Sequence, residues 1–314
     1  MDIADLQKLA ERTRSGHEVG IALIFASCIL ALFLFVPISP KNELPAPITT
    51  TTTTPDAFAQ IPLEARAAIV YDLATRETLY EKNSDAQLPL ASLTKLLTVY
   101  AALRELSPNT PITISANATR LDSPRIFSAG QTLALSDLAR LTLTASLNDG
   151  AAAIAEATAE RENNSQDKMF AGAAAALGLS QTYAVNGSGL DVNAAVSGGY
   201  GSARDLAILA GALFEQSPEI ARATTKSSAE AISEDGKSFS VKNTDPMIST
   251  IPRLLLSKTG YTDLAGGNLA LVFDSGIGHP IAVVVLGSSQ KARFTDGATL
   301  VSATLAHFAG VDSL

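Results

Sequence analysis

Strand-forming segments lie near both ends of the chain, with a long alanine-rich stretch between them. Residues 67–72 and 77–81 predict one β-hairpin near the start. Residues 268–274 and 281–287 predict a second hairpin near the end. Residues 100–250, between the hairpins, have mainly helical patterns. This order indicates an α+β fold, in which strands distant in the sequence meet in one antiparallel sheet that helices cover.

Residues 19–38 predict an uncleaved transmembrane signal-anchor helix, because they carry no formal charge and are long enough to span the hydrocarbon layer. A cleaved signal peptide is the alternative, although its apolar core usually has only about 7–15 residues. The basic residues that precede the segment are Lys8, Arg12 and Arg14. Only Lys41 follows it closely. The positive-inside bias predicts that residues 1–18 are cytoplasmic. The chain after the helix that crosses the cell membrane is then extracytoplasmic.

Residues 39–62 form a proline- and threonine-rich stretch that includes the run Thr49 to Thr54. Such a composition cannot bury a core and favours extended conformations. We therefore expect a linker here and one folded domain over residues 63–314. The linker would hold that domain near the membrane, at the cell wall or its precursors.

Charge, cysteine and histidine content narrow the possible chemistry. The net charge is −8 with a pI near 5.0, so we expect no nucleic-acid partner, whose binding surface would be basic. Cys28 is the single cysteine, and the three histidines lie too far apart in sequence for metal-ligand spacing. We expect no metal and no cofactor. A hydrolase built from this sequence must activate its nucleophile without a histidine cluster.

Ser92 and Lys95 lie three residues apart at the start of a predicted helix that runs to Leu106. That spacing places the hydroxyl and the amine on one helical face. A lysine there can act as the base if burial and a second cation lower its pKa. The spacing alone is weak, because Ser165 with Lys168 and Ser288 with Lys291 share it. Taken alone, the spacing favours the alternative that Ser92 is an ordinary serine at a helix start.

Ser146-Leu147-Asn148 follows a mostly apolar segment and precedes a helix predicted over 150–159. A serine and an asparagine in such a turn can relay a proton and hold a substrate amide. The alternative is that they only cap the helix.

Lys258-Thr259-Gly260 occurs once in the chain, beside a stretch with β propensity. A lysine, a hydroxyl and a glycine suit an edge strand that pairs with a substrate backbone. Gly260 would allow that backbone to approach closely, and Lys258 would be the second cation near Lys95. An exposed turn is the alternative. Further along, a helix is predicted from Phe294 to Ala309.

Together, in this order, the three motifs resemble the S-x-x-K, S-x-N and K-T-G set of β-lactamases and penicillin-binding proteins. Over residues 63–310 the chain looks like the low-molecular-mass D-alanyl-D-alanine carboxypeptidases. The segments that carry this likeness are Pro89 to Lys95, Ser146 to Gly150, Asn186 to Leu190, Ser202 to Ala207, Lys242 to Thr244 and Lys258 to Gly267.

The resemblance implies a β-lactamase/transpeptidase-like fold with a five-stranded antiparallel sheet and a helical subdomain. It also implies a serine-type carboxypeptidase that trims terminal D-alanine from peptidoglycan stem peptides through an acyl-enzyme, with β-lactams as covalent inhibitors. The sequence ends soon after the last predicted helix, so we expect the N-terminal helix to replace the family's C-terminal anchor.

The same resemblance implies a role for each motif residue. Ser92 is the nucleophile, Lys95 accepts its proton and Ser146 assists proton transfer. Asn148 binds substrate. Lys258, Thr259, Gly260 and Arg293 form the substrate-binding region toward the terminal carboxylate. The backbone N–H groups of Ser92 and Tyr261 form the oxyanion hole.

Two departures concern substrate preference: Leu147 in the second motif, where the family more often has glycine, and the approach Arg253 to Ser257 before Lys258.

Three alternatives remain. A D,D-endopeptidase on peptidoglycan cross-links would use identical machinery. A class A-like β-lactamase would need a glutamate-bearing loop, and residues 180–200 contain only Asp191 as an acid. The last alternative is a non-catalytic wall-binding sensor.

Overall fold

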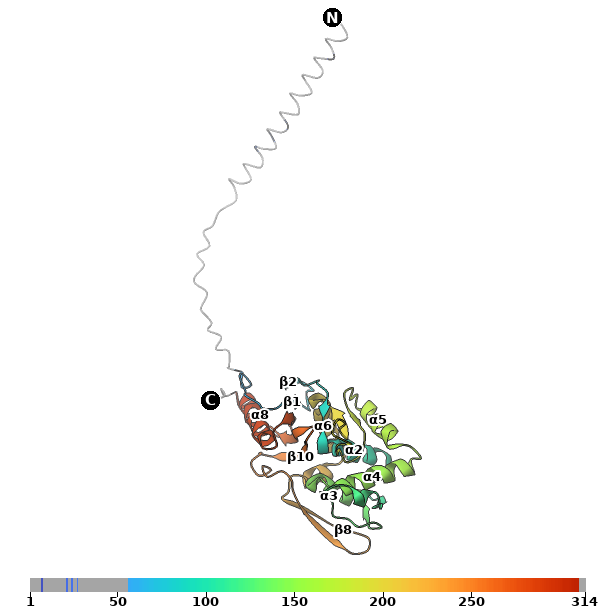
Figure 1. Ribbon diagram of the computed structural model, residues 1–314. Coiled ribbons are helices and arrows are strands. Elements are labelled where there is room, and N and C mark those ends of the chain that lie inside the picture. Colours follow the sequence, from blue (N-terminus) through green and yellow to red (C-terminus); the bar gives the residue numbers. More distant parts are fainter. Residues whose placement is uncertain (1–6, 8–20, 22–23, 25–26, 28–55, 311–314) are drawn as a thin grey trace. The chain divides into compact units, whose positions relative to one another are not determined.

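The structure is a computed structural model that describes residues 7, 21, 24, 27 and 56–310 (Figure 1). The chain divides into two units, Met1–Thr53 and Thr54–Leu314, and the fold described below belongs to the second. Apart from those four single residues, the predicted cytoplasmic segment and the predicted anchor lie outside the described residues, as does most of the predicted linker. In the part of the chain that is described, no helix is both long and apolar enough to cross a membrane.

Five antiparallel strands form the main sheet of the second unit. Their order across the sheet is β10-β11-β12-β1-β2. The strands are β1 (Ala67–Asp72), β2 (Thr78–Lys82), β10 (Leu254–Thr262), β11 (Gly266–Asp274) and β12 (Pro280–Ser288). This confirms the predicted α+β class and the main antiparallel sheet built from distant strands. Near the centre of the sheet, β1 pairs with β12, which lies about 200 positions later in the sequence.

Both faces of the sheet are buried at its three inner strands, which explains why β1, β11 and β12 are mostly apolar rather than alternating. In β1, Ala67 and Ile69 belong to one hydrophobic cluster, whereas Ala68 and Val70 belong to the other. Helix α8 (Ala292–Ala309) packs on the second face, and α6 (Ala203–Gln216) packs on the first (Figure 1).

The remaining elements lie between β2 and β10 in the sequence and include the helical subdomain. The helices are η1 (Ala91–Leu93), α2 (Thr94–Glu105), η2 (Ala118–Arg120), α3 (Leu135–Ala145), α4 (Asn148–Arg161), α5 (Gln166–Ala176) and α7 (Pro218–Ala223). The short strands are β3 (Leu88–Pro89), β4 (Pro111–Thr113), β5 (Thr132–Ala134), β6 (Tyr183–Ala184), β7 (Gly199–Gly201), β8 (Ser228–Ile232) and β9 (Ser238–Lys242). The helix predicted from Ser92 therefore begins as a 3₁₀ turn and continues as α2.

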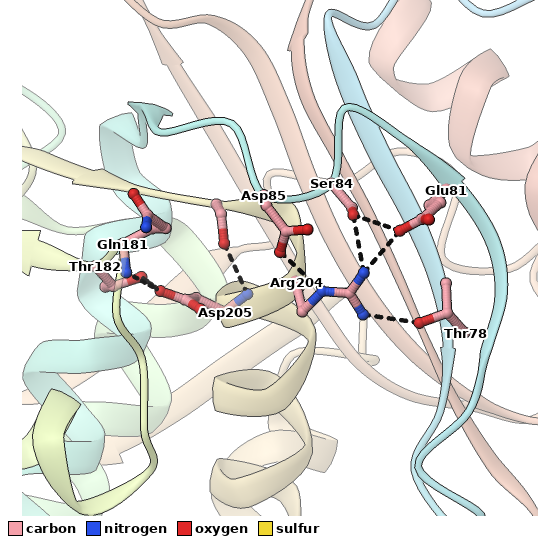
Figure 2. Close-up of polar contacts among 9 residues, drawn as sticks. Thr78, Glu81, Ser84, Asp85, Gln181, Thr182, Arg204 and Asp205 are labelled. Carbon is pink, nitrogen blue, oxygen red and sulfur yellow. Dashed lines mark hydrogen bonds and ion pairs between the residues drawn. The ribbon is translucent and has the colours of Figure 1, made fainter.

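The start of α6 ties the helical part of the domain to the edge of the sheet (Figure 2). The Arg204 guanidinium donates to the Asp85 carboxylate at 2.8 Å and to the Glu81 carboxylate at 2.7 Å. It also donates to the Thr78 hydroxyl at 2.7 Å. The next residue, Asp205, accepts from the backbone N–H of Gln181 at 2.8 Å. The segment around Arg204 thus has a structural role, fixing the loop after β2 from which the chain enters β3 and η1.

Asn268, in β11, also fixes the chain just before Ser92. Its fully buried carboxamide donates to the Pro89 carbonyl at 3.0 Å and accepts from the Gly287 N–H at 2.8 Å. A residue in the middle of the sheet therefore sets the position of η1 relative to β10 and β12.

Candidate active site

Ser92 lies in η1, one helical turn before Lys95. Ala91, directly before it, adopts a left-handed conformation with φ of 49°, which is unusual for a residue with a side chain. The Leu90 N–H donates to the Gly199 carbonyl at 2.9 Å, so the entry into η1 is held by β7. Ser92 itself is only half-buried. Its hydroxyl is therefore both rigidly placed and open to a ligand.

The Lys95 amine is fully buried and has three oxygen neighbours. Nζ lies 2.8 Å from the Asn148 Oδ1 and 2.6 Å from the Ser188 carbonyl oxygen, and both of these atoms can only accept. The third neighbour is the Ser92 Oγ, at 2.8 Å. A neutral amine has two N–H bonds and one lone pair. Once the two acceptors take the N–H bonds, the lone pair is left for the Ser92 hydroxyl proton.

Burial also favours the neutral form of Lys95. Desolvation, and then the positive charge of Lys258, hold the pKa of Lys95 well below its usual value, while Asp149 opposes this shift. Lys258 is buried too, and its pKa is lowered to about 7 by desolvation and then by Arg293. The site therefore combines close cations with little water, which is what a lysine base requires.

Ser146 and Lys258 form the second half of the site. Ser146 ends α3 in a left-handed conformation, with φ of 59°, which turns the chain directly into α4. The Lys258 Nζ donates to the Ser146 Oγ at 2.9 Å and to the Thr259 carbonyl at 2.7 Å. In the same turn, Asn148 donates from Nδ2 to the Asp122 carbonyl at 2.9 Å, which directs its Oδ1 toward Lys95.

Gly260 lies directly against η1. A Cβ atom added there would lie 3.0 Å from the Leu90 carbonyl oxygen and 3.3 Å from the Ser92 backbone nitrogen. The close approach of the nucleophile's own backbone thus favours glycine here, a reason that we had not predicted from the sequence. The adjoining Tyr261, which is 45% exposed, lies next along β10, an edge strand of the sheet as predicted.

Arg293 approaches the same strand from α8. The residue is 8% exposed, and its guanidinium donates to the Gly260 carbonyl at 2.6 Å. It lies over the ring of Phe294, with 4.6 Å to the centroid. Its Nε has no partner among the described residues. The guanidinium thus retains unused donors beside the Lys258–Gly260 segment.

The serines that share the motif spacings lie apart from this cluster. Ser165 is exposed at the start of α5, and the Ser288 hydroxyl donates to the Asp296 carboxylate at 2.8 Å. The motif spacing therefore does not distinguish Ser92 from these serines, whereas its position in the structure does.

Ser188 is a site residue that we did not single out from the sequence. Its backbone carbonyl, not its side chain, contacts Lys95. Asn186 holds that loop, since its Oδ1 accepts from the N–H groups of Ser188 at 3.1 Å and Gly189 at 2.8 Å. The Asn186 to Leu190 segment was visible as part of the family resemblance, but a backbone contact leaves no signal of its own.

Asp149 is a second such residue. Its fully buried carboxylate accepts from the N–H groups of Ile126 at 2.7 Å and Phe127 at 2.8 Å. It therefore fixes the loop that follows Asp122, and the Asp122 carbonyl in turn accepts from Asn148. It also contributes the one negative charge that stabilises a positive charge on Lys95.

Comparison with known proteins decides the family. The family model described as D-alanyl-D-alanine carboxypeptidase, peptidase S11, matches residues 49–290. The chain belongs to this family. The match includes the S-x-x-K, S-x-N and K-T-G segments and ends just before α8, so Arg293 lies outside it.

Individual relatives agree with this assignment. The D-alanyl-D-alanine carboxypeptidase DacF of Bacillus subtilis is 30% identical to this chain. The matched region covers 76% of this chain and 64% of that relative's length. The D-alanyl-D-alanine endopeptidase of Pseudomonas aeruginosa is 29% identical, covering 80% of this chain and 82% of the relative. Among solved structures, penicillin-binding protein D2 of Listeria monocytogenes in its ampicillin-bound form has a TM-score of 0.66 and 29% identity, covering 78% of this chain and 98% of that one. The fold is therefore the penicillin-binding-protein fold.

Proposed function

We propose that this protein is a serine-type D-alanyl-D-alanine carboxypeptidase that removes terminal D-alanine from peptidoglycan stem peptides. The observation that carries the proposal is the Lys95 amine, whose two N–H bonds are matched by fixed acceptors and whose third neighbour is the Ser92 hydroxyl. Membership of the D-alanyl-D-alanine carboxypeptidase family supports the substrate class.

In the first half of the reaction, Ser92 Oγ attacks the carbonyl carbon of the penultimate D-alanine while Lys95 Nζ accepts the hydroxyl proton. The backbone N–H groups of Ser92 and Tyr261 stabilise the oxyanion that forms. The C–N bond then breaks and leaves an acyl ester on Ser92.

The leaving D-alanine needs a proton on its amine and a partner for its carboxylate. Ser146, in contact with Lys258, relays the proton. Thr259 and Arg293 bind the carboxylate, and Asn148 holds both Lys95 and the substrate amide. Water then attacks the ester with Lys95 as the base, releasing the shortened peptide and restoring the Ser92 hydroxyl.

β-Lactams are expected to acylate Ser92, because the Listeria relative with a matching fold is known in an ampicillin-bound form. Release is expected to be slow. Asp191, the only acid in the 180–200 segment, is engaged by Thr262 Oγ1 at 3.1 Å at the end of β10. Rapid turnover of nitrocefin would contradict this expectation.

A D,D-endopeptidase activity is the second candidate. The Pseudomonas relative with that name is matched over more of its own length than the Bacillus carboxypeptidase. Beside the site, a groove of about 740 Å³ is lined by Ser188, Asp191 and Tyr261. A groove of that size can take the longer peptide of a cross-link.

We also propose that the domain acts outside the cytoplasm, anchored by an uncleaved helix over residues 19–38. The support is the length and lack of charge of that segment. Fractionation of cells that produce the full chain, with protease added to intact spheroplasts, tests this. Recovery of the protein in the soluble fraction at its mature, shortened mass would favour a cleaved signal peptide instead.

The reaction is tested with a pentapeptide muropeptide and a cross-linked dimer, with D-alanine release and acyl-enzyme mass followed in parallel. Wild type is expected to release D-alanine from the pentapeptide, and Ser92→Ala to release none and to form no adduct. Ser165→Ala, the control with the same motif spacing, is expected to retain full activity. Cleavage of the dimer alone would establish the endopeptidase, and activity of Ser92→Ala would refute the nucleophile.

A further inference from the structure

The turn over residues 243–247 lies beside β10 and is held by several hydrogen bonds. Asn243 donates from its carboxamide to the Thr224 carbonyl at 2.6 Å and accepts from the Asp245 N–H at 2.9 Å. Asp245 is buried, and its carboxylate accepts from the Ser257 hydroxyl at 2.6 Å and from the Met247 N–H at 2.7 Å. The turn is therefore fixed to the strand that carries the third motif.

Thr244, at the exposed side of this turn, contacts the motif threonine directly. Its Oγ1 lies 2.7 Å from the Thr259 Oγ1. The Thr244 N–H donates to the Thr144 carbonyl at 3.2 Å, which holds its backbone against the end of α3. Among the described residues, Thr244 is the only side chain hydrogen-bonded to the Thr259 hydroxyl.

A hydroxyl has one proton, and either threonine could donate it to the other. A bound carboxylate can only accept, so it requires the Thr259 proton to point into the cleft. That orientation leaves an oxygen lone pair of Thr259 free to accept from Thr244. A chain of two hydroxyls ending on a carboxylate also strengthens each bond by polarisation.

We propose that Thr244 is a positioning residue for Thr259. Its hydroxyl donates to Thr259 and thereby directs the Thr259 proton to the carboxylate of the substrate's terminal residue. The inference rests on the proposed function and extends it: selectivity for a free carboxyl terminus depends on Thr244 as well as on Thr259 and Arg293.

The test compares two peptides that differ only at the C-terminus, acyl-D-alanyl-D-alanine and its C-terminal amide. Thr244→Val keeps the branched shape and removes the hydroxyl. We expect kcat/KM for the acid to fall by up to about tenfold, mostly through KM, which is the upper range for the loss of one hydrogen bond between neutral groups. For the amide we expect less than a twofold change. Thr244→Ser, which restores the hydroxyl, is expected to recover the wild-type preference.

Thr250→Val is the matched control, because it removes an exposed hydroxyl that bonds only within the same turn, to the Met247 carbonyl at 2.7 Å. It is expected to leave both peptides unchanged. An equal loss on the acid and the amide, an equal loss in Thr250→Val, or no recovery in Thr244→Ser would overturn the proposal.

If the wild type cleaved neither peptide, so that neither D-alanine nor D-alaninamide was released, the proposed function would fail, yet this inference would still be tested. Acylation of Ser92 by benzylpenicillin and by its methyl ester, followed by intact mass, makes the same comparison. A loss in Thr244→Val confined to the free acid would support the positioning role, and equal losses on acid and ester would refute it.

Discussion

The Lys258 amine lies 2.9 Å from the Ser146 hydroxyl, joining residues 112 positions apart in the chain. Lys258 comes from the edge of the sheet, and Ser146 comes from a left-handed turn in the helical part of the domain. The contact therefore depends on how these two parts of the domain pack together, and in the proposed mechanism proton transfer depends on it as well.

This contact predicts that Ser146 and Lys258 act as one unit. Ser146→Ala and Lys258→Met are each expected to slow acylation by roughly a hundredfold, and the double variant to be little worse than either. Acylation rates from a fluorescent penicillin complete the cycle. Ser146→Ala combined with Ser165→Ala is the control and should match Ser146→Ala alone. Multiplicative losses in the Ser146/Lys258 double variant would mean that the contact has no catalytic role.

The buried lysines predict an acid limb in the pH profile of acylation. Lys95 can accept a proton only when it is neutral, and its lowered pKa makes this form available at lower pH than for an ordinary lysine. The rate is expected to fall as the pH drops below the pKa of Lys95. Lys258→Met removes a nearby positive charge, so the pKa of Lys95 rises and the limb moves to higher pH. Rates measured from pH 5 to pH 10 would contradict this if the limb stayed in place.

The same lysines predict that stability increases with pH. Between about 7, the pKa of Lys258 in the fold, and roughly 10.4, that of an unfolded lysine, the unfolded chain binds more protons, so raising the pH favours the fold. Urea unfolding of the domain at pH 7.5 and 9.5 measures this. Lys258→Met is expected to reduce the gain between these pH values by roughly 2 kcal/mol. Lys168→Met, at an exposed position, serves as the control and should leave the gain unchanged.

Gly260 predicts a steric effect on the nucleophile. Gly260→Ala would place a methyl group 3.0 Å from the Leu90 carbonyl oxygen, so η1 or β10 must shift. We expect kcat to fall at least tenfold, with a loss of about 1–3 kcal/mol in the free energy of unfolding. Gly276→Ala, at a hairpin turn where an added Cβ meets nothing within 4 Å, is the control. Wild-type kinetics in Gly260→Ala would show that η1 tolerates the displacement.

The main features of the fold could be predicted because they follow from local patterns. Both hairpins, the edge strand at Lys258 and the closing helix were visible as runs of apolar residues bounded by turns. The strand order could not be worked out from periodicity alone. It depends on β1 pairing with β12, which no local signal encodes, and the five-stranded sheet was expected only from the family resemblance.

The site was predictable only where side chains carry its chemistry. Ser92, Lys95, Ser146 and Lys258 were predicted, and the structure joins Ser92 to Lys95 and Ser146 to Lys258 by hydrogen bonds. The Ser188 carbonyl was not predictable, because every residue has one and only the fold selects which one meets a lysine. The contact of Thr244 with Thr259 likewise depends on a turn whose position relative to β10 is a tertiary property.

β10 has a ladder partner on one side only, because the sheet ends there. Sheet edges left open in this way invite pairing with other chains, and most proteins shorten or cover them. Here the strand carries Lys258, Thr259 and Gly260, and Gly260 lies against η1, so a cover over this edge would also lie beside the candidate site. The open backbone groups of β10 are therefore available both to a substrate peptide and to an edge strand of a second copy of the chain. A ligand paired with β10 is expected to block that association as well as the site.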